Sequence, residues 1–266
     1  MTHFFFTLTL AMYVAATSAY LVCLFRQPSR LSGWAIKLLG AGCFSHLLST
    51  IHLAVKVKHL PLTTMQESLS FFSLAIVAGF LLFDRWYKVA TLGAFVTPVA
   101  LLMFATSAAM HGEVRPLPPI LQSNWFWIHA LLAFISYAAF TIAAGVAVMY
   151  LIQRYFLKTR HFSGLFQKLP PLETMDEISY RSLAIGFPLL TVAIISGAIW
   201  SEKAIGSYWT WDPKQIWSLI TWLIYAALLH GRLVIGWRGK RAAILSIIGF
   251  VVLLVTFLGM KHSITW

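Results

Sequence analysis

Long apolar stretches dominate the sequence and recur eight times, separated by short polar segments. A bilayer core about 30 Å thick is crossed by roughly 20 apolar residues in a helix. Backbone groups in lipid must be hydrogen-bonded internally, which favours helices over isolated strands. The pattern therefore predicts about eight transmembrane helices, over residues 4–25, 34–57, 68–83, 89–110, 126–152, 181–200, 216–235 and 242–260. The third run is short, so it either tilts in the bilayer or extends backward through residues 63–67.

The composition agrees with residence in a membrane. Apolar residues make up 59% of the chain, charged residues only 11%, and the mean hydropathy is +0.79, whereas soluble domains carry about 25% charged residues. We expect an all-α, polytopic membrane protein. No repeat, linker or low-complexity segment divides the chain, so residues 1–266 are expected to form a single transmembrane domain. The first run lacks a basic leader and is interpreted as a retained helix, not a signal peptide.

The distribution of Lys and Arg predicts the orientation of the chain in the membrane. With eight spans, one set of loops holds 14 of the 20 basic residues: Arg26, Arg30, Lys37, Arg85, Lys88, Arg154, Lys158, Arg160, Lys168, Arg181, Arg232, Arg238, Lys240 and Arg241. That side is expected to be cytoplasmic, or stromal in a plastid, with both termini outside. The net charge of +12 then reflects topology and affinity for anionic membrane lipid. Basic residues spread over short loops speak against a nucleic-acid partner.

Two further features concern the loops and the cysteines. In the inner loop, LETMDEISYR follows Pro170 and Pro171 and suits a short interfacial helix. Cys23 and Cys43 lie inside predicted helices without CxxC spacing, so we interpret them as small buried apolar residues and expect no disulfide or zinc site. The chain has no CxxCH motif.

Three of the nine histidines stand out by their predicted depth, because polar residues in a membrane are costly and often functional. His129 begins the fifth run and His262 follows the eighth, so the topology brings both to the outer face. His230 lies about fourteen residues into the seventh run, roughly 21 Å down. Of the other six, His3, His111 and His161 are interpreted as solvated, and His46 and His52 on the second run as either functional or hydrogen-bonded across helices. His59 is given no role.

An aromatic segment lies between the sixth and seventh runs, at the predicted outer boundary. Residues 208–222 read YWTWDPKQIWSLITW and contain four tryptophans, at 209, 211, 217 and 222. Imidazoles at two depths suit iron, copper or zinc. Large indole faces suit a planar porphyrin better than a bare metal ion. The alternative is an interfacial tryptophan belt with incidental histidines, and composition alone leaves both interpretations open.

The segment GSYWTWDPKQIWSLITWLIYAALLHGR resembles the tryptophan-rich WWD signature of haem-handling membrane proteins. The WWD segment itself is placed at about residues 201–222 of this chain. The form DPKxxWSLITW is similar to the CcsA (ResC) family, the membrane subunit of the System II cytochrome c synthase. HLPLTTMQESLSF, IHALLAFISYAAF, GFPLLTVAIISGAIW and GWRGKRAA also agree with that family, so the resemblance covers roughly the last 200 residues.

The resemblance implies a synthase subunit that carries haem b to the outer face. There the haem would be attached through two thioether bonds to the CxxCH cysteines of apocytochrome c. His129 and His262 resemble the external axial ligands of the haem iron, and His230 resembles a histidine of an intramembrane haem site. The second ligand of that site usually comes from a CcsB-type partner, and we expect activity only with that partner. The membrane would be the bacterial inner membrane or the thylakoid.

The same resemblance implies roles for the residues of the aromatic segment. Trp209, Trp211, Trp217 and Trp222 would form a slot that fixes which vinyl group meets which thiol, and Asp212 would either contact haem or cap the following helix. In the second case Pro213 would take the first helical position. Lys214 would pair with a haem propionate or extend to the interface. No nucleophile–base pair stands out, which agrees with a template role rather than acid–base catalysis.

The sequence departs from the family pattern at two places. Many relatives have Trp-Gly at the start of the motif and Glu after the lysine, where this chain has Ile205, Gly206 and Gln215. The segment after the eighth run is also shortened, so the alignment of His262 rests on its predicted side and depth. Two rival functions stay open: haem delivery without ligation, as in CcmC, and a non-catalytic assembly subunit.

Overall fold

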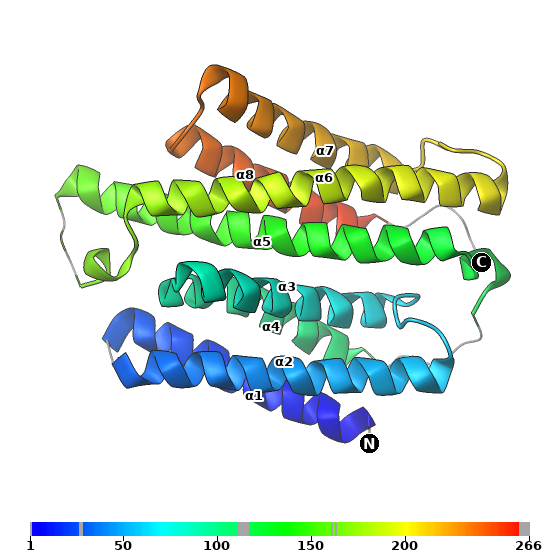
Figure 1. Ribbon diagram of the computed structural model, residues 1–266, viewed down its shortest axis with the longest axis horizontal. Coiled ribbons are helices and arrows are strands. Elements are labelled where there is room, and N and C mark those ends of the chain that lie inside the picture. Colours follow the sequence, from blue (N-terminus) through cyan, green and yellow to red (C-terminus); the bar gives the residue numbers. More distant parts are fainter. Residues whose placement is uncertain (1, 27–28, 111–116, 161, 163, 261–266) are drawn as a thin grey trace. The chain divides into compact units, whose positions relative to one another are not determined.

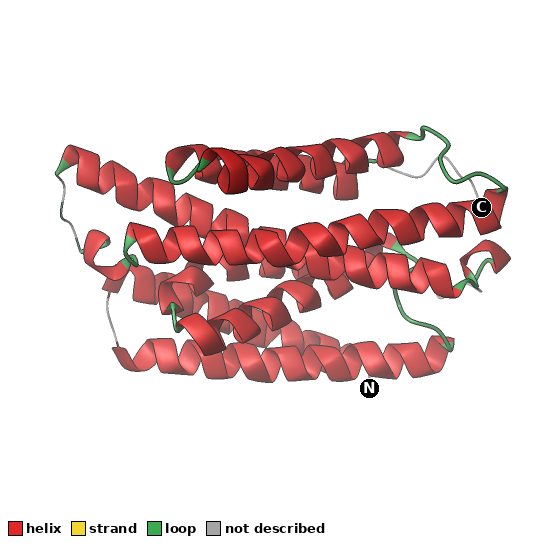
Figure 2. Ribbon diagram, turned by 45° about the horizontal axis from the view of Figure 1, so that its top comes forward, coloured by secondary structure: helices red, strands yellow, loops and turns green. Residues whose placement is uncertain are grey.

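The computed structural model describes residues 2–26, 29–110, 117–160, 162 and 164–260, and within them it contains only helices and loops (Figures 1 and 2). Eight helices of the described chain are long and apolar enough to cross a membrane. The prediction of an all-α, multi-pass membrane protein is therefore confirmed. The helices are α1 (Thr2–Arg26), α2 (Ser29–Val57), α3 (Met65–Tyr87), α4 (Ala90–Ala109), α5 (Asn124–Thr159), α6 (Leu172–Ile205), α7 (Pro213–His230) and α8 (Lys240–Leu254).

Short helical turns complete the described chain. The 3-10 turns η1 (Pro119–Leu121) and η2 (Phe166–Lys168) lie in loops, and the π-helical turns η3 (Gly231–Ile235) and η4 (Val255–Gly259) continue α7 and α8. The chain divides into two compact units, Met1–Arg115 with Ile152–Pro171, and Pro116–Leu151 with Leu172–Trp266. The single transmembrane domain stays a prediction.

The third helix begins earlier than its apolar run, because a capping box fixes its start. The Thr64 hydroxyl accepts the Glu67 N–H, and the Glu67 carboxylate accepts the N–H groups of Thr64 and Thr63 at 3.1 and 2.8 Å. These bonds satisfy backbone donors that a helix start leaves without intrahelical partners. α3 therefore gains a full turn at its beginning. The short run extends backward, which was one of the two alternatives.

In the first unit, a buried histidine joins three helices. Nδ1 of His46 on α2 lies 3.1 Å from the Tyr13 hydroxyl on α1, and its Nε2 lies 2.9 Å from the Ser70 hydroxyl on α3. Phe104 of α4 packs edge-on against the imidazole at 4.5 Å. Both ring nitrogens are thus hydrogen-bonded, and His46 is a packing residue of this unit. His52, six residues further along α2, is exposed.

In the second unit, helices α5 to α8 share an apolar core. The Phe140 ring of α5 stacks on the Tyr225 ring of α7, with 3.7 Å between centroids and 5° between planes. Leu183 and Leu190 of α6 and Leu253 of α8 are buried in the same cluster. Other large apolar side chains, such as Ile195 and Leu223, are exposed, as expected for helices that face lipid.

The start of α6 differs from the prediction. LETMDEISYR does not form a separate interfacial helix but the first turns of α6, which runs without a break from Leu172 to Ile205. Pro170 and Pro171 precede the helix rather than interrupt it, so nothing in the sequence separates the polar turns from the apolar run. These polar turns carry Asp176, which takes part in an ion pair described below.

Candidate functional site

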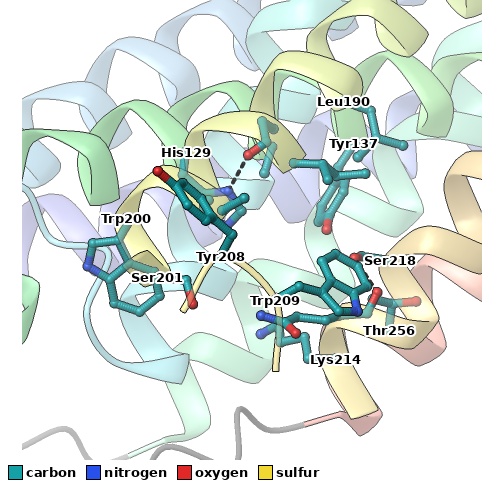
Figure 3. A pocket seen from close by; sticks show the side chains of 16 residues that line it. His129, Tyr137, Leu190, Trp200, Ser201, Tyr208, Trp209, Lys214, Ser218 and Thr256 are labelled. Atoms are coloured by element: carbon teal, nitrogen blue, oxygen red, sulfur yellow. Dashed lines mark hydrogen bonds between the residues drawn. The ribbon is translucent and has the colours of Figure 1, made fainter. Parts of the chain in front are cut away.

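The aromatic segment borders a cavity in the second unit. α5 begins, α6 ends and α7 begins at the same end of this unit, where residues 206–212 connect α6 to α7 (Figure 1). The cavity between these elements has about 70 Å³ of space open to the centre of a water molecule. The polar or aromatic residues that line it are His129, Tyr137, Trp200, Ser201, Tyr208, Trp209, Lys214, Gln215, Ser218 and Thr256 (Figure 3).

Local hydrogen bonds fix the loop that bears the tryptophans. Asp212 is buried and caps α7, because its carboxylate accepts the Gln215 N–H at 2.8 Å, and Pro213 takes the first helical position. The Gln215 side-chain carbonyl in turn accepts the Thr210 N–H at 2.8 Å. Between these bonds Trp211 is held at φ 59°, a left-handed conformation that costs a non-glycine residue about 1–3 kcal/mol. The expected capping role of Asp212 is thus observed.

His129 is oriented by a backbone carbonyl of the facing helix. Its Nδ1 lies 2.6 Å from the Ala193 carbonyl oxygen of α6, shown as a dashed line in Figure 3. A carbonyl can only accept, so Nδ1 carries a proton, and in the neutral ring Nε2 then carries the lone pair. Histidines that bind metals commonly donate their other N–H to a carbonyl in this way. The tautomer and the ring position of His129 therefore match those of an iron ligand.

A glycine makes room for this imidazole. A Cβ built on Gly197, one turn after Ala193, would lie 2.6 Å from Nδ1 and 2.9 Å from Cε1 of His129. Both distances are shorter than real Cβ contacts allow. The close approach of the ring to α6 therefore requires glycine at position 197.

Trp209 and Lys214 bring polar hydrogens to the cavity. The indole Nε1 of Trp209 is buried and has no hydrogen-bond acceptor among the described residues, and a buried unsatisfied donor costs about 1–3 kcal/mol. Lys214 is the one formally charged residue among the described residues that line the cavity. An anionic or hydrogen-bond-accepting ligand would satisfy both groups.

The other tryptophans of the motif lie outside the lining of the cavity. Trp211 is 69% exposed, with its ring edge-on to Trp209 at 5.9 Å between centroids. Trp222 donates its indole N–H to the Thr191 hydroxyl at 2.9 Å and packs against Phe187 of α6. Trp217 is half-buried, and its carbonyl accepts the Thr221 and Thr256 hydroxyls. The haem contacts of these three residues stay predictions.

Of the two other candidate histidines, one lies far from this cavity and the other lies outside the described residues. His230 is the last residue of α7 and is exposed. It lies about 26 Å along the helix from Pro213, at 1.5 Å per residue. His262 lies outside the described residues. Of the three proposed iron ligands, His129 is thus the one that the described structure places at the cavity.

An ion pair fixes the chain next to His230. Arg232 of η3 donates to both carboxylate oxygens of Asp176 on α6, at 3.0 and 2.7 Å, and lies over the Tyr180 ring at 5.1 Å. Its side chain is 7% exposed and that of Asp176 is 20% exposed. The Gly239 N–H also points to Asp176, at 3.3 Å. Asp176 therefore ties the end of α7 and the start of α8 to α6.

We expect Arg232→Met to destabilise the protein by about 3 kcal/mol, because it leaves the Asp176 carboxylate partly buried without its guanidinium partner. The double variant Arg232→Met/Asp176→Asn should recover part of this loss, because it removes the uncompensated charge. Unfolding in mixed micelles of increasing SDS, followed by helical circular dichroism, measures both effects. Equal stabilities of the single and double variants would contradict the assignment.

Sequence reasoning missed several residues of the cavity. Tyr137 and Thr256 line it from α5 and η4, and Ser218 lies one turn after Lys214 on the same face of α7. The i, i+4 spacing of Lys214 and Ser218 was a usable signal, because polar residues rarely share a face of a membrane helix without a reason. Gly197 and the Ala193 carbonyl gave no signal, because their role depends on the packing of α5 against α6.

Comparison with known proteins identifies the family. A family model described as Cytochrome C assembly protein matches residues 35–265. The cytochrome c biogenesis protein CcsA of Guillardia theta is 35% identical over 233 residues, which cover 78% of this chain and 77% of the relative. CcsA of Mesostigma viride is 36% identical over 84% of each chain.

The chain belongs to the CcsA family.

Membership in the CcsA family places the chain in cytochrome c biogenesis. CcsA of the bacterium Gloeobacter violaceus is 33% identical over 80% of each chain. The fold also resembles that of a solved structure, the cytochrome c haem lyase CcmF, with a TM-score of 0.75 and 17% identity. That likeness covers 99% of this chain but 47% of the CcmF chain, so this chain spans about half of it and shares its fold.

Proposed function

We propose that the chain is the haem-presenting subunit of a cytochrome c synthase. In this proposal haem b would occupy the cavity of the second unit, where His129 and His262 are the residues that would bind its iron. A CcsB-type membrane subunit completes the synthase, and apocytochrome c with a CxxCH motif is the acceptor. Family membership supports the role in cytochrome c biogenesis.

The observation that carries the proposal is the setting of His129. Its Nδ1–H is bonded to the Ala193 carbonyl, and its ring lines a cavity bordered by Trp209 of the WWD segment. The neutral imidazole with its lone pair on Nε2 can bind iron without adding charge. The buried Trp209 N–H without a described acceptor indicates that the cavity takes a ligand with hydrogen-bond acceptors. Haem, with an apolar macrocycle and two carboxylates, matches these residues.

The residues of the chain would act by positioning. Bound haem supplies the two vinyl groups that become the attachment points. Each CxxCH thiol adds across one vinyl group: the sulfur forms the thioether C–S bond and the thiol hydrogen goes to the neighbouring carbon, without net oxidation. Trp209 and Tyr208 would restrict the orientation of the macrocycle. Fixing two reacting groups in a productive geometry contributes about 7–11 kcal/mol to the lowering of the barrier.

His230 would serve at a second level of the membrane. It is exposed at the far end of α7, and the Arg232–Asp176 pair holds the turn that follows it. An exposed histidine on one subunit can be joined by a ligand from another chain, which supports a site shared with a CcsB-type partner. We propose that haem enters there from the cytoplasmic or stromal side and leaves at the His129 side.

The same orientation gives the localisation. The excess of Lys and Arg in the loops on the His230 side supports a cytoplasmic or stromal placement of that side. The cavity and both termini would then lie on the periplasmic or lumenal side of a bacterial inner membrane or a thylakoid.

The proposal is tested by expressing the chain with a CcsB-type subunit and a CxxCH acceptor protein. Thioether-linked haem on the acceptor is measured by haem staining after denaturing electrophoresis and by mass spectrometry. We expect product only with both membrane subunits, and none with an SxxSH acceptor. Haem in the purified chain without product would support delivery without ligation and contradict the synthase role, and absence of haem would contradict haem handling as a whole.

A further inference from the structure

The cavity holds two hydrogen-bond donors that an iron ligand does not explain. The Trp209 indole N–H is buried without an acceptor among the described residues. Lys214 lines the same cavity from the first turn of α7, and no carboxylate of the described residues lies within 4.0 Å of its ammonium group. In Figure 3 both side chains are drawn at the lower edge of the cavity. They form a small donor cluster, with one N–H and one positive charge.

The charges around this cluster favour a carboxylate. Asp212 is the nearest acidic residue in the sequence. Its carboxylate accepts the Gln215 N–H as the cap of α7, and its charge also acts on the Lys214 ammonium group from outside the cavity lining. No Asp or Glu is among the described residues that line the cavity. The first turn of an 18-residue helix adds a partial positive charge. A carboxylate here would gain a charge-assisted bond from Lys214 and a second bond from Trp209.

We propose that Trp209 Nε1–H and Lys214 Nζ together bind one propionate carboxylate of the haem. This inference rests on the proposed function and adds to it a residue pair that sets the rotation of the macrocycle about its normal. With one propionate held at the α7 end and the iron held by His129, the rotation of the macrocycle about its normal would be restricted. Trp209 then acts through its N–H as well as through its ring.

A membrane lipid could supply the same chemistry, because phosphate headgroups also accept hydrogen bonds from indole and ammonium groups. The two sources differ in how they respond to esterification of the haem and to lipid charge. Binding is therefore measured in nanodiscs of phosphatidylcholine, which is zwitterionic, and repeated in nanodiscs that contain phosphatidylglycerol.

The experiment compares haem with its dimethyl ester, in which both propionates are neutral. Affinities are obtained by Soret titration of the full chain and of its variants Trp209→Phe and Lys214→Met. We expect each variant to bind haem about 10-fold more weakly, as for the loss of a hydrogen bond to a charged group. For the dimethyl ester, the affinity of each variant should stay within about 2-fold of the affinity of the unmodified chain for the same ester. The reason is that the ester lacks the charge that the pair recognises.

The chain offers a matched control pair outside the cavity. Lys37 lies over the exposed Trp34 ring at 5.1 Å on α2, so Trp34→Phe and Lys37→Met remove the same groups elsewhere. Both should leave the two affinities unchanged. Equal losses for haem and its ester would overturn the carboxylate assignment and leave the proposed function intact. If the preference for haem over its dimethyl ester disappears in nanodiscs that contain phosphatidylglycerol, the two donors bind lipid. That result would also overturn the carboxylate assignment. If the unmodified chain binds neither haem nor its dimethyl ester, the proposed function itself is wrong.

Discussion

His129→Gly should remove most of the haem bound at the proposed outer site, and millimolar imidazole should restore it. The substitution removes the one described histidine at the cavity and leaves a space of the shape of imidazole. Glycine inside α5 costs roughly 1 kcal/mol of helix stability, which a helix packed into the core of its unit tolerates. The Soret band of the purified protein, before and after addition of imidazole, measures the result.

The matched control is His52→Gly, because His52 is an exposed histidine on another membrane helix. It should change neither the intensity nor the position of the Soret band. His262→Gly should behave like His129→Gly, while His230→Gly should lower the total haem carried. If His129→Gly retains the spectrum of the unmodified chain, the assignment of His129 as an iron ligand is wrong.

Gly197→Ala should weaken haem binding by an order of magnitude without unfolding the protein. The added Cβ would lie 2.6 Å from Nδ1 of His129, so the ring must move and its bond to the Ala193 carbonyl is lost. Alanine is a better helix former than glycine by about 1 kcal/mol, so α6 itself is not weakened. Haem titration and thermal denaturation of the same sample separate the two effects.

Gly40→Ala on α2 provides the control, because nothing lies within 4 Å of a Cβ built at Gly40. It should leave haem binding unchanged while making the same change in a helix. A Gly197→Ala protein with the affinity of the Gly40→Ala protein would show that the orientation of His129 by α6 is unimportant for binding.

The sequence predicted the helices well because lipid imposes strong constraints on the chain. Each span must be apolar for about 20 residues and helical throughout, so the eight runs correspond to eight helices. The exact starts depend on polar contacts. Thr64 and Glu67 extend α3 backward through a capping box, which the TTMQE pattern allowed. At α6 no breaker separates LETMDEISYR from the apolar run, and the helix is continuous.

The candidate site was predictable only in part, because a motif gives residues but not the direction of their side chains. Trp217 and Trp222 are five residues apart on α7, which places them about 140° apart around the helix. They therefore face different sides of α7, and Trp222 packs against α6. Helical spacing alone could have shown this. The bond between His129 and the Ala193 carbonyl joins residues 64 positions apart, and no local pattern predicts it.

His46 shows why depth alone does not identify a functional histidine. It lies within a membrane helix, as a ligand could, but Tyr13 and Ser70 engage both of its nitrogens. The cost of burying a polar ring is here offset by bonds between helices. At His129 the bond to one nitrogen comes from a carbonyl, and the ring lines a cavity. The difference lies in the partners, which only the structure gives.

The central claim, that Nε2 of His129 binds the haem iron in this cavity, is tested most directly by electron–nuclear double resonance of the ferric haem. The chain is labelled with ¹⁵N-histidine, and the spectrum is compared with that of labelled His129→Gly protein restored by unlabelled imidazole. We predict that one axial ¹⁵N coupling is replaced by a ¹⁴N coupling while the other remains. Two unchanged ¹⁵N couplings in the restored variant would contradict the claim.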